Sequence, residues 1–460
     1  MSDTVAQGYF NDPRLSEAKK LIQDTLKEHS KKITGVKAAD PELKKSYEEL
    51  LEDFAKLRGG KLFYNYLGTG IGNGALVELA DGSVKYDFIT GIGVHFFGHS
   101  HPGVVNAQVE GALTNTTMSG NLQQNVDSPK LFDLILKHAN VNGAGFDHMF
   151  MTSSGVMAAE NALKMVFQKR SPANRVLAFE KCFMGRTLAV SQITDKDVYR
   201  NGLPDTLAVD YIPFYDYKDH QGSIDKAVSM LDKYFKRHPG KYAAFCMELI
   251  QGEGGYWVGH KDYFKAIIDI CKKNNVSIIV DEVQTFMRTS SLFAFQYFGL
   301  DKDVDMVNIG KNSQVCATIY REDHKPRPGL ISQTFTSSGS AINAAYYMIN
   351  HIAEEGFLGE NGKTNQLHKR FSDNLEKIAA KMPDVLEGPW GVGGMVGMSV
   401  FKGDFEKSKA FTFKLFENGV MGFIAGANPT RVRFLVPLGA VTTDDIDNVC
   451  NIIEQTLSEM

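Results

Sequence analysis

The sequence predicts an α/β protein in which helices flank a mainly parallel sheet, with a smaller α+β domain built from both ends of the chain. Between about residues 100 and 345, short apolar runs alternate with amphipathic stretches, and this alternation is typical of a parallel sheet covered on both faces. From about residue 346 a long helical pattern comes first. Strand-like runs at 395–401 and 431–436 follow, and a helix from residue 443 closes the chain.

The order of these patterns predicts three parts. Residues 1–75 form an N-terminal helical segment that joins the small domain, residues 76–345 form the large domain, and residues 346–460 form the C-terminal small domain. The first part contains two or three amphipathic helices within residues 12–58. Short strands and turns follow at 76–95, where Asp81-Gly82 indicates a hairpin.

Within the large domain, five apolar runs have the length of buried strands. Helical periodicity separates them, for example at 157–168 and 260–274. The predicted strands are 148–152, 176–179, 243–248, 276–281 and 305–309.

Composition narrows the class of protein. The chain has 460 residues, of which 43% are hydrophobic and 23% charged, with a net charge of −4. This balance gives no electrostatic reason to expect nucleic-acid or membrane binding. The five cysteines are scattered without a Cys-x-x-Cys pair. The polar N-terminus lacks the apolar region of a secretion signal, so we expect a cytoplasmic protein.

Polar residues stand where several predicted strands end. Asp281-Glu282 ends one apolar run, Glu248 ends another, and Gly310-Lys311 follows a third. Ligands of open α/β sheets bind at the carboxyl ends of the strands. An acid and a lysine that reach this edge from different strands can share one site, although strand ends also turn polar simply because they meet water.

Thr152-Ser153-Ser154-Gly155 follows a strand and opens a helix. Small residues at a helix N-terminus leave backbone N–H groups free to hold a phosphate. An ordinary serine N-cap explains the same residues. The lysine-bearing phosphate loop of nucleotide triphosphatases is absent from the sequence.

Two other motifs carry little weight. Gly68-x-Gly70-x-Gly72 lacks the spacing of a dinucleotide-binding loop. His95, His99 and His101 lie close together but have no adjacent cysteine or acid, so we expect a packed turn there and predict no metal site.

Taken in order along the chain, these motifs resemble the class III (omega) aminotransferases, which are fold-type I enzymes that use pyridoxal 5'-phosphate (PLP). The resemblance runs from about residue 75 to the end. It is carried by Glu248-Leu-Ile-Gln-Gly-Glu253, by Asp281-Glu-Val-Gln284-Thr and by Gly310-Lys311. Within the class, the segments 159–164 and 310–316 look most similar to the lysine 6-aminotransferases.

The resemblance implies a cofactor site within the large domain. Lys311 would bind PLP as a Schiff base and then transfer a proton, for which a lysine of lowered pKa is suited. Asp281 would pair with the pyridine nitrogen and keep it protonated, so that the ring acts as an electron sink. The remaining cofactor-binding residues implied are Ser154, Gly155 and Val156 for the phosphate, Phe183 and Val283 for the two ring faces, Gln284 for the phenolic oxygen, and Thr334 from the neighbouring subunit of a homodimer.

The resemblance also implies three substrate-binding residues. Arg186 would grip a substrate carboxylate, since a planar guanidinium binds a carboxylate at two points. Arg433 would pair with Glu253 while the amino donor reacts. It would separate from Glu253 to bind the α-carboxylate of 2-oxoglutarate.

The sequence departs from the family pattern in four places. Met184 replaces a histidine, and Met157 and Ala159 replace a glutamate and an asparagine in the phosphate helix. Segment 285–289 lacks the usual glycines. Ser332 and residues 335–337 replace an asparagine and a Trp-Gly-Gly stretch. The last two segments line the substrate channel in relatives, so these changes bear on the choice of donor.

The reaction expected is the transfer of a terminal (omega) amino group, from an amino acid such as lysine, to 2-oxoglutarate, forming a semialdehyde and glutamate. Ornithine, acetylornithine and 4-aminobutyrate remain open as donors. An aminomutase or racemase is the second interpretation, because fold does not fix function. A non-catalytic protein that keeps the fold is the third, and the presence of Lys311, Asp281 and Phe183 argues against it.

Overall fold

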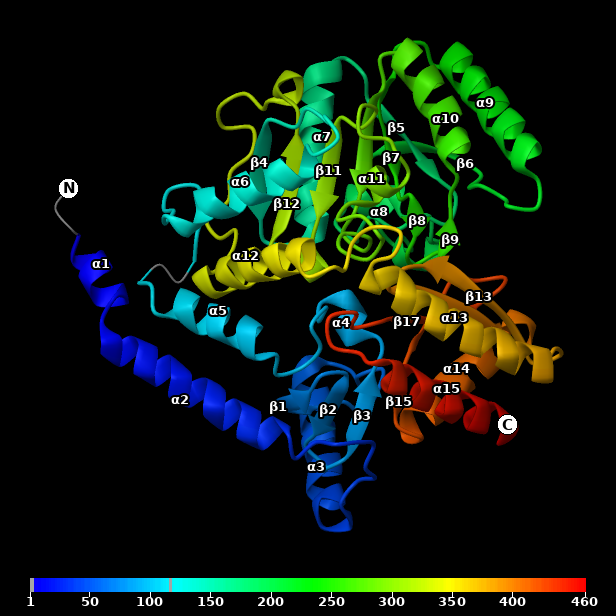
Figure 1. Ribbon diagram of the computed structural model, residues 1–460. Coiled ribbons are helices and arrows are strands. Elements are labelled where there is room, and N and C mark those ends of the chain that lie inside the picture. The colour runs from blue at the N-terminus through cyan, green and yellow to red at the C-terminus, as the bar shows by residue number, and fades with distance from the viewer. Residues whose placement is uncertain (1–3, 116–117) are drawn as a thin grey trace.

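The structure is a computed structural model that describes residues 4–115 and 118–460 (Figure 1). It opens with three helices, α1 (Val5–Phe10), α2 (Pro13–Ser30) and α3 (Pro41–Arg58). Thr4, Asp12 and Asp40 cap them by accepting backbone N–H groups of their first turns, as short polar side chains do at helix starts. These helices agree with the amphipathic pattern of residues 12–58.

Both ends of the chain contribute to the next sheet. Its order is β1-β2-β3-β15, with β1 (Gly68–Asn73), β2 (Leu76–Leu79), β3 (Val84–Asp87) and β15 (Val420–Met421). The predicted hairpin at Asp81-Gly82 joins β2 to β3, and Gly82 adopts a φ of 76° there. Strand pairing thus joins residues 76–87, which the sequence grouped with the large domain, to a C-terminal strand. The domain limits themselves stay predictions.

The central sheet has seven strands in the order β4-β12-β11-β10-β7-β5-β6. All neighbouring pairs are parallel except those of β12, which runs antiparallel to both of its neighbours. This confirms the predicted α/β class and the five predicted strands. The strands are β4 (His148–Thr152), β5 (Arg175–Phe179), β6 (Ala208–Ile212), β7 (Tyr242–Met247), β10 (Ser277–Asp281), β11 (Met306–Ile309) and β12 (Cys316–Tyr320).

Helices cover this sheet. Helix α7 (Gly155–Arg170) packs on β11, β12 and β7, while α9 (His220–Arg237) and α10 (Lys261–Lys273) pack against each other beside β6 and β10 (Figure 1). The other long helices of this part are α5 (Pro102–Ala112), α6 (Asp127–Ala139) and α12 (Gly339–Glu354). The short elements are α4 (Thr90–Gly93), α8 (Val190–Ile193), η1 (Asp197–Tyr199), β8 (Ile250–Gln251), β9 (Trp257–Val258), α11 (Ala294–Tyr297), η2 (Lys311–Ser313) and η3 (Glu322–His324).

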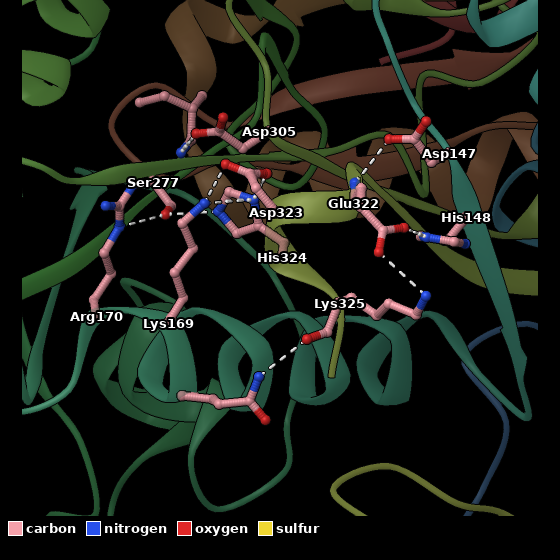
Figure 2. Close-up of polar contacts among 12 residues, drawn as sticks. Asp147, His148, Lys169, Arg170, Ser277, Asp305, Glu322, Asp323, His324 and Lys325 are labelled. Carbon is pink, nitrogen blue, oxygen red and sulfur yellow. Dashed lines mark hydrogen bonds and ion pairs between the residues drawn. The ribbon is translucent and has the colours of Figure 1, made fainter. Parts of the chain in front are cut away.

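A polar network fixes the edge of the sheet that lies opposite the predicted site (Figure 2). His324 is buried there, and its ring nitrogen lies 2.9 Å from the Ser277 hydroxyl at the start of β10. Arg170, at the end of α7, donates to the same hydroxyl at 3.0 Å. Lys169 pairs with Asp323 beside them. These bonds hold the C-terminal end of α7 on the sheet and thereby fix the direction of its other end.

The C-terminal part contains an antiparallel sheet of order β13-β14-β17-β16. Its strands are β13 (Leu386–Val392), β14 (Met395–Val400), β16 (Phe423–Ala425) and β17 (Arg431–Leu435), and the segment η4 (Phe401–Gly403) follows β14. The helices α13 (Lys363–Lys381), α14 (Phe405–Glu417) and α15 (Thr443–Ser458) lie around it (Figure 1). The predicted strands at 395–401 and 431–436 and the closing helix are therefore confirmed.

The weaker motifs are structural. The three glycines at 68–72 lie within strand β1. The Nε2 atom of His99 lies 2.9 Å from Asp87, and His101 caps α5 by accepting from Val104. The expected packed turn is thus present. Across the described residues, no helix is long and apolar enough to cross a membrane.

Candidate active site

Lys311 lies at the carboxyl end of β11, where the chain turns sharply. Its φ is 57°, a conformation that costs energy for a residue with a side chain and is common at functional sites. Within residues 4–115 and 118–460, nothing forms a hydrogen bond or ion pair with its Nζ. Burial, together with the positive charges of Arg433 and Arg288, lowers the pKa of Lys311 to about 8. The amine is therefore partly neutral near physiological pH.

Asp281 ends the neighbouring strand β10 and is paired in register with Asn308, three residues before Lys311. The predicted acid and lysine thus reach the same edge from adjacent strands. Burial raises the pKa of Asp281 to about 7, although the N–H of Val283, which donates to Oδ1 at 2.9 Å, opposes the rise. A cation placed against this carboxylate would restore its ionisation.

Val283 lies between the lysine segment and the start of α7. A Cβ atom added at Gly155 would lie 2.8 Å from Cγ2 of Val283, and one added at Gly310 would lie 3.2 Å from Cγ1. A side chain at Gly155 would force Val283 to shift, and one at Gly310 would press against it, so the two glycines allow both segments to approach Val283 closely. This close approach brings the phosphate-binding motif next to the end of the lysine strand.

Helix α7 presents its N-terminus at this edge. Ser154 is its N-cap and accepts from the backbone N–H of Met157 at 3.3 Å. The N–H groups of Gly155 and Val156 belong to the first turn, which has no intrahelical acceptors, and the helix dipole favours an anion there. The capping interpretation and the phosphate interpretation are thus compatible.

Phe183 is held in place by a buried acid to which the sequence assigned no role. Its backbone N–H donates to Oε2 of Glu248 at 2.8 Å, and Gly252 donates to Oε1 at 3.0 Å. Burial raises the pKa of Glu248 to about 8, although the hydrogen bonds from these two N–H groups oppose the rise. Glu248 therefore links the segment of Phe183 to the loop that carries Glu253.

Arg433 and Glu253 form the predicted ion pair. Arg433 is fully buried on β17 and binds Oε1 of Glu253 through Nη2. Its Nη1 donates to the carbonyl of Gly252 at 3.1 Å and to Oε1 of Gln284 at 3.3 Å. Burial opposes ionisation of Glu253, but the guanidinium outweighs burial and holds the pKa of that carboxyl below its usual value.

Arg186 lies at the protein surface, beside the aromatic rings of Tyr199 and Phe183. It is exposed, and its guanidinium lies 3.9 Å from the ring centroid of Tyr199 and 5.8 Å from that of Phe183. Lys196 lies 4.9 Å from the same Tyr199 ring. A cavity of about 160 Å³, lined by Phe183, Lys196 and Glu253 among others, opens beside them. No sequence motif indicated Tyr199 or Lys196.

Thr334 is exposed and forms no side-chain hydrogen bond with the described residues of its own chain. Its neighbour Gln333 binds the segment that precedes the phosphate helix. Oε1 of Gln333 accepts from the Thr152 hydroxyl at 2.7 Å and from the Ser153 backbone N–H at 3.2 Å. The hydrophobic ring of Phe335 is 61% exposed on the same loop. This loop therefore supports the Thr152–Ser153 segment and leaves Thr334 accessible.

The segments that depart from the family pattern fall into two groups. Phe286, Met287 and Arg288 are buried rather than exposed to a channel. Arg288 donates to Oδ1 of Asn312 at 3.1 Å, next to Lys311, and burial lowers its pKa to about 10. Met184 is also buried, in the core. By contrast, Ser332 and Phe335 lie on the surface.

The family model described as "Aminotransferase class-III" matches residues 67–457. The chain belongs to the class-III aminotransferases. The acetylornithine aminotransferase of Caldanaerobacter subterraneus subsp. tengcongensis is 30% identical over 399 residues, which cover 85% of this chain and 94% of that protein. The acetylornithine aminotransferase of Methanocaldococcus jannaschii is 30% identical over 405 residues, covering 85% and 93%.

Solved structures share the fold. The lysine aminotransferase from M. tuberculosis in the internal aldimine form has a TM-score of 0.79 at 22% identity and covers 89% of this chain and 99% of that chain. The ornithine aminotransferase from Toxoplasma gondii ME49 has a TM-score of 0.74 at 24% identity, covering 90% and 97%. These likenesses confirm the fold-type I architecture. The enzyme is a PLP-dependent transaminase, as its family implies.

The residues of the site fit PLP. The buried carboxylate of Asp281 accepts one hydrogen bond from the described residues, the amine of Lys311 is unpaired there, and the start of α7 offers N–H groups to a phosphate. Gly155 leaves the space that a Cβ atom would fill. An acid for the pyridine nitrogen, an amine for the aldehyde and a helix N-terminus for the phosphate thus meet around Val283.

Proposed function

We propose that this transaminase moves the terminal amino group of an amino acid such as lysine to 2-oxoglutarate, forming a semialdehyde and glutamate. The observation that carries the proposal is the buried Arg433–Glu253 pair, whose two charges both influence the pKa of Lys311. A carboxylate of 2-oxoglutarate can replace Glu253 as the partner of Arg433. An aminomutase has no separate second substrate that would need such an exchange.

Bound PLP supplies an electron sink for the carbon that loses its proton. Around it we assign roles to the residues of the site. Lys311 moves the proton through Nζ, for which a pKa of about 8 is well matched. Asp281 holds a proton on the pyridine nitrogen. The other assignments are Phe183 and Val283 against the ring faces, Gln284 at the phenolic oxygen, and Ser154, Gly155 and Val156 around the phosphate.

The two substrates require opposite states of Arg433. While the pair is closed, Glu253 neutralises the charge of Arg433. The carbon chain that carries the donor's terminal amine can then lie beside a pair that has no net charge. When Glu253 turns away, Arg433 is free for the α-carboxylate of 2-oxoglutarate. Arg186 is exposed and without a carboxylate partner among the described residues, so it is available to the carboxylate of the donor.

The donor is tested by single half-reactions, in which the enzyme is mixed with one amine and the loss of its visible absorption is followed. We expect lysine to react fastest. The names of the relatives favour acetylornithine as the second candidate. If acetylornithine reacts fastest, it replaces lysine as the proposed donor, and the proposed transfer of a terminal amino group stands. Reaction with α-amino donors alone would overturn the proposal.

We further propose that the enzyme is a cytoplasmic homodimer in which Thr334 completes the phosphate site of the neighbouring subunit. The accessible position of Thr334 and the exposed ring of Phe335 beside it support this arrangement.

A further inference from the structure

A second arginine of β17, Arg431, is enclosed by the only two tryptophans in the chain. Its guanidinium carbon lies 3.9 Å from the ring centroid of Trp257 and 3.9 Å from that of Trp390. The side chain is 2% exposed. Because alternate residues of a strand share a face, Arg431 and Arg433 project from the same side of β17.

This stack joins two distant parts of the chain. Trp257 begins β9, directly after the loop that carries Glu253, whereas Trp390 belongs to β13 of the C-terminal sheet. Arg431 also donates from Nη1 to the carbonyl of Gly255 at 2.7 Å. The loop 252–257 is therefore attached to the C-terminal sheet by contacts that do not involve the Glu253 carboxylate.

The two arginines differ in what holds them. Arg433 pairs with a carboxylate, and that bond must break when a substrate carboxylate binds. In the described part of the chain, Arg431 has no carboxylate within ion-pair distance, and the Nε of each of the two arginines lacks a hydrogen-bond partner. Aromatic faces and one carbonyl hold it, and these contacts do not change with the charge of the substrate.

We propose that Arg431, stacked between Trp257 and Trp390, is a positioning residue that anchors loop 252–257 while Glu253 leaves Arg433. The loop then stays in place and only the Glu253 side chain turns, so that the carbonyl of Gly252 continues to orient Arg433 for 2-oxoglutarate. This inference rests on the proposed function of the Glu253–Arg433 pair and identifies what limits its motion.

Single-turnover kinetics of Arg431→Lys test the anchor, because lysine keeps the charge and loses the planar stack. We expect the concentration of 2-oxoglutarate that gives half-maximal rate to rise by at least about tenfold, with the donor half-reaction changed less than about threefold. Trp390→Leu, which removes one ring and leaves Arg431, should show the same split. Arg370→Lys is the matched control, since Arg370 forms an exposed ion pair that joins α13 to Asp447 of α15 and does not involve loop 252–257.

Tryptophan fluorescence gives a second readout, because all of it comes from the stack. Glutarate, an unreactive dicarboxylate of the length of 2-oxoglutarate, should leave acrylamide quenching of the wild-type holoenzyme unchanged and should increase it in Arg431→Lys. A rise in wild-type quenching would overturn the inference, since the loop would then move with Glu253. Equal losses in both half-reactions would also overturn it. A wild type that does not react with 2-oxoglutarate would overturn the proposed function as well.

Discussion

The Glu253–Arg433 pair allows a quantitative prediction, because Arg433 is fully buried while the Glu253 side chain is 18% exposed. Glu253→Gln keeps the size of the side chain and removes its charge. Removing one partner of a fully buried pair costs about 3–5 kcal/mol. Arg433 retains the carbonyl of Gly252 and Oε1 of Gln284 as acceptors, so we expect a smaller loss of unfolding free energy, of about 2 kcal/mol.

In a chain of 460 residues this loss is a small shift in melting temperature. The entropy of unfolding is about 2.1 cal/mol/K per residue, or about 1 kcal/mol/K for the whole chain, so Tm should fall by about 2 °C. Calorimetry of the holoenzyme measures this fall in Tm. Glu49→Gln is the matched control, because Glu49 is exposed and its ion pair with Lys45 is long, at 3.9 Å. This substitution should leave Tm unchanged.

Kinetics separate this charge effect from a general loss of packing. Glu253→Gln exposes the charge of Arg433 to the donor and, because the Glu253 charge raises the pKa of Lys311, lowers that pKa below about 8. The donor half-reaction should slow by about ten- to a hundredfold, or about 1.4–2.7 kcal/mol. The half-reaction with 2-oxoglutarate should change little.

A double variant can refute the reasoning. If Glu253→Gln destabilises the protein by leaving a buried cation unpaired, adding Arg433→Met removes the cation and restores part of the lost stability. If the stability losses of the two single variants instead add in the double variant, the pair does not act as a unit. Equal slowing of both half-reactions by Glu253→Gln would refute the assigned role.

Three further predictions concern the cofactor site. Lys311→Ala should retain no PLP after borohydride reduction, and covalent PLP trapped on another residue would contradict the assignment of Lys311. Covalent capture of PLP by the apoenzyme should accelerate as pH rises through about 7 to 8, because Asp281 ionises above about 7 and Lys311 loses its proton above about 8; a capture rate that is flat across this range would argue against both shifts. Each mixed dimer of one Lys311→Ala and one Thr334→Ala subunit should contain one site with both defects and one site with neither, and a stable, fully active monomer would rule out the shared site.

The fold was largely predictable because the buried strands of a parallel sheet are short and almost wholly apolar. Strand β6 escaped detection because Asp210 interrupts its pattern. In the structure that carboxylate accepts hydrogen bonds from Arg175 of the neighbouring strand β5 at 2.6 Å and from Tyr242 of β7 at 2.6 Å, which compensates its charge. Strand β12 escaped because it follows Lys311 almost directly and is the antiparallel member of the sheet.

The site was predictable where its residues belong to ordered motifs and not where they depend on tertiary contacts. Lys311 and Asp281 stand at strand ends, which a sequence pattern can indicate. Arg288 stands between two apolar residues and a run of polar ones, and its partner Asn312 is identified only when the chain folds. The role of Glu248 likewise depends on two backbone N–H groups that are 65 residues and 4 residues away.

Charge balance explains why the unpredicted residue Arg288 matters beside the predicted charged residues. Lys311 shares the site with two buried guanidinium groups, Arg433 and Arg288, and with the two acids Asp281 and Glu253, all of which influence its pKa. In the switch that we propose, Glu253 turns away from Arg433, and its departure strengthens the positive field at the amine. The proposed motion of Glu253 therefore favours the neutral form of Lys311 until a carboxylate of the second substrate restores a negative charge beside Arg433.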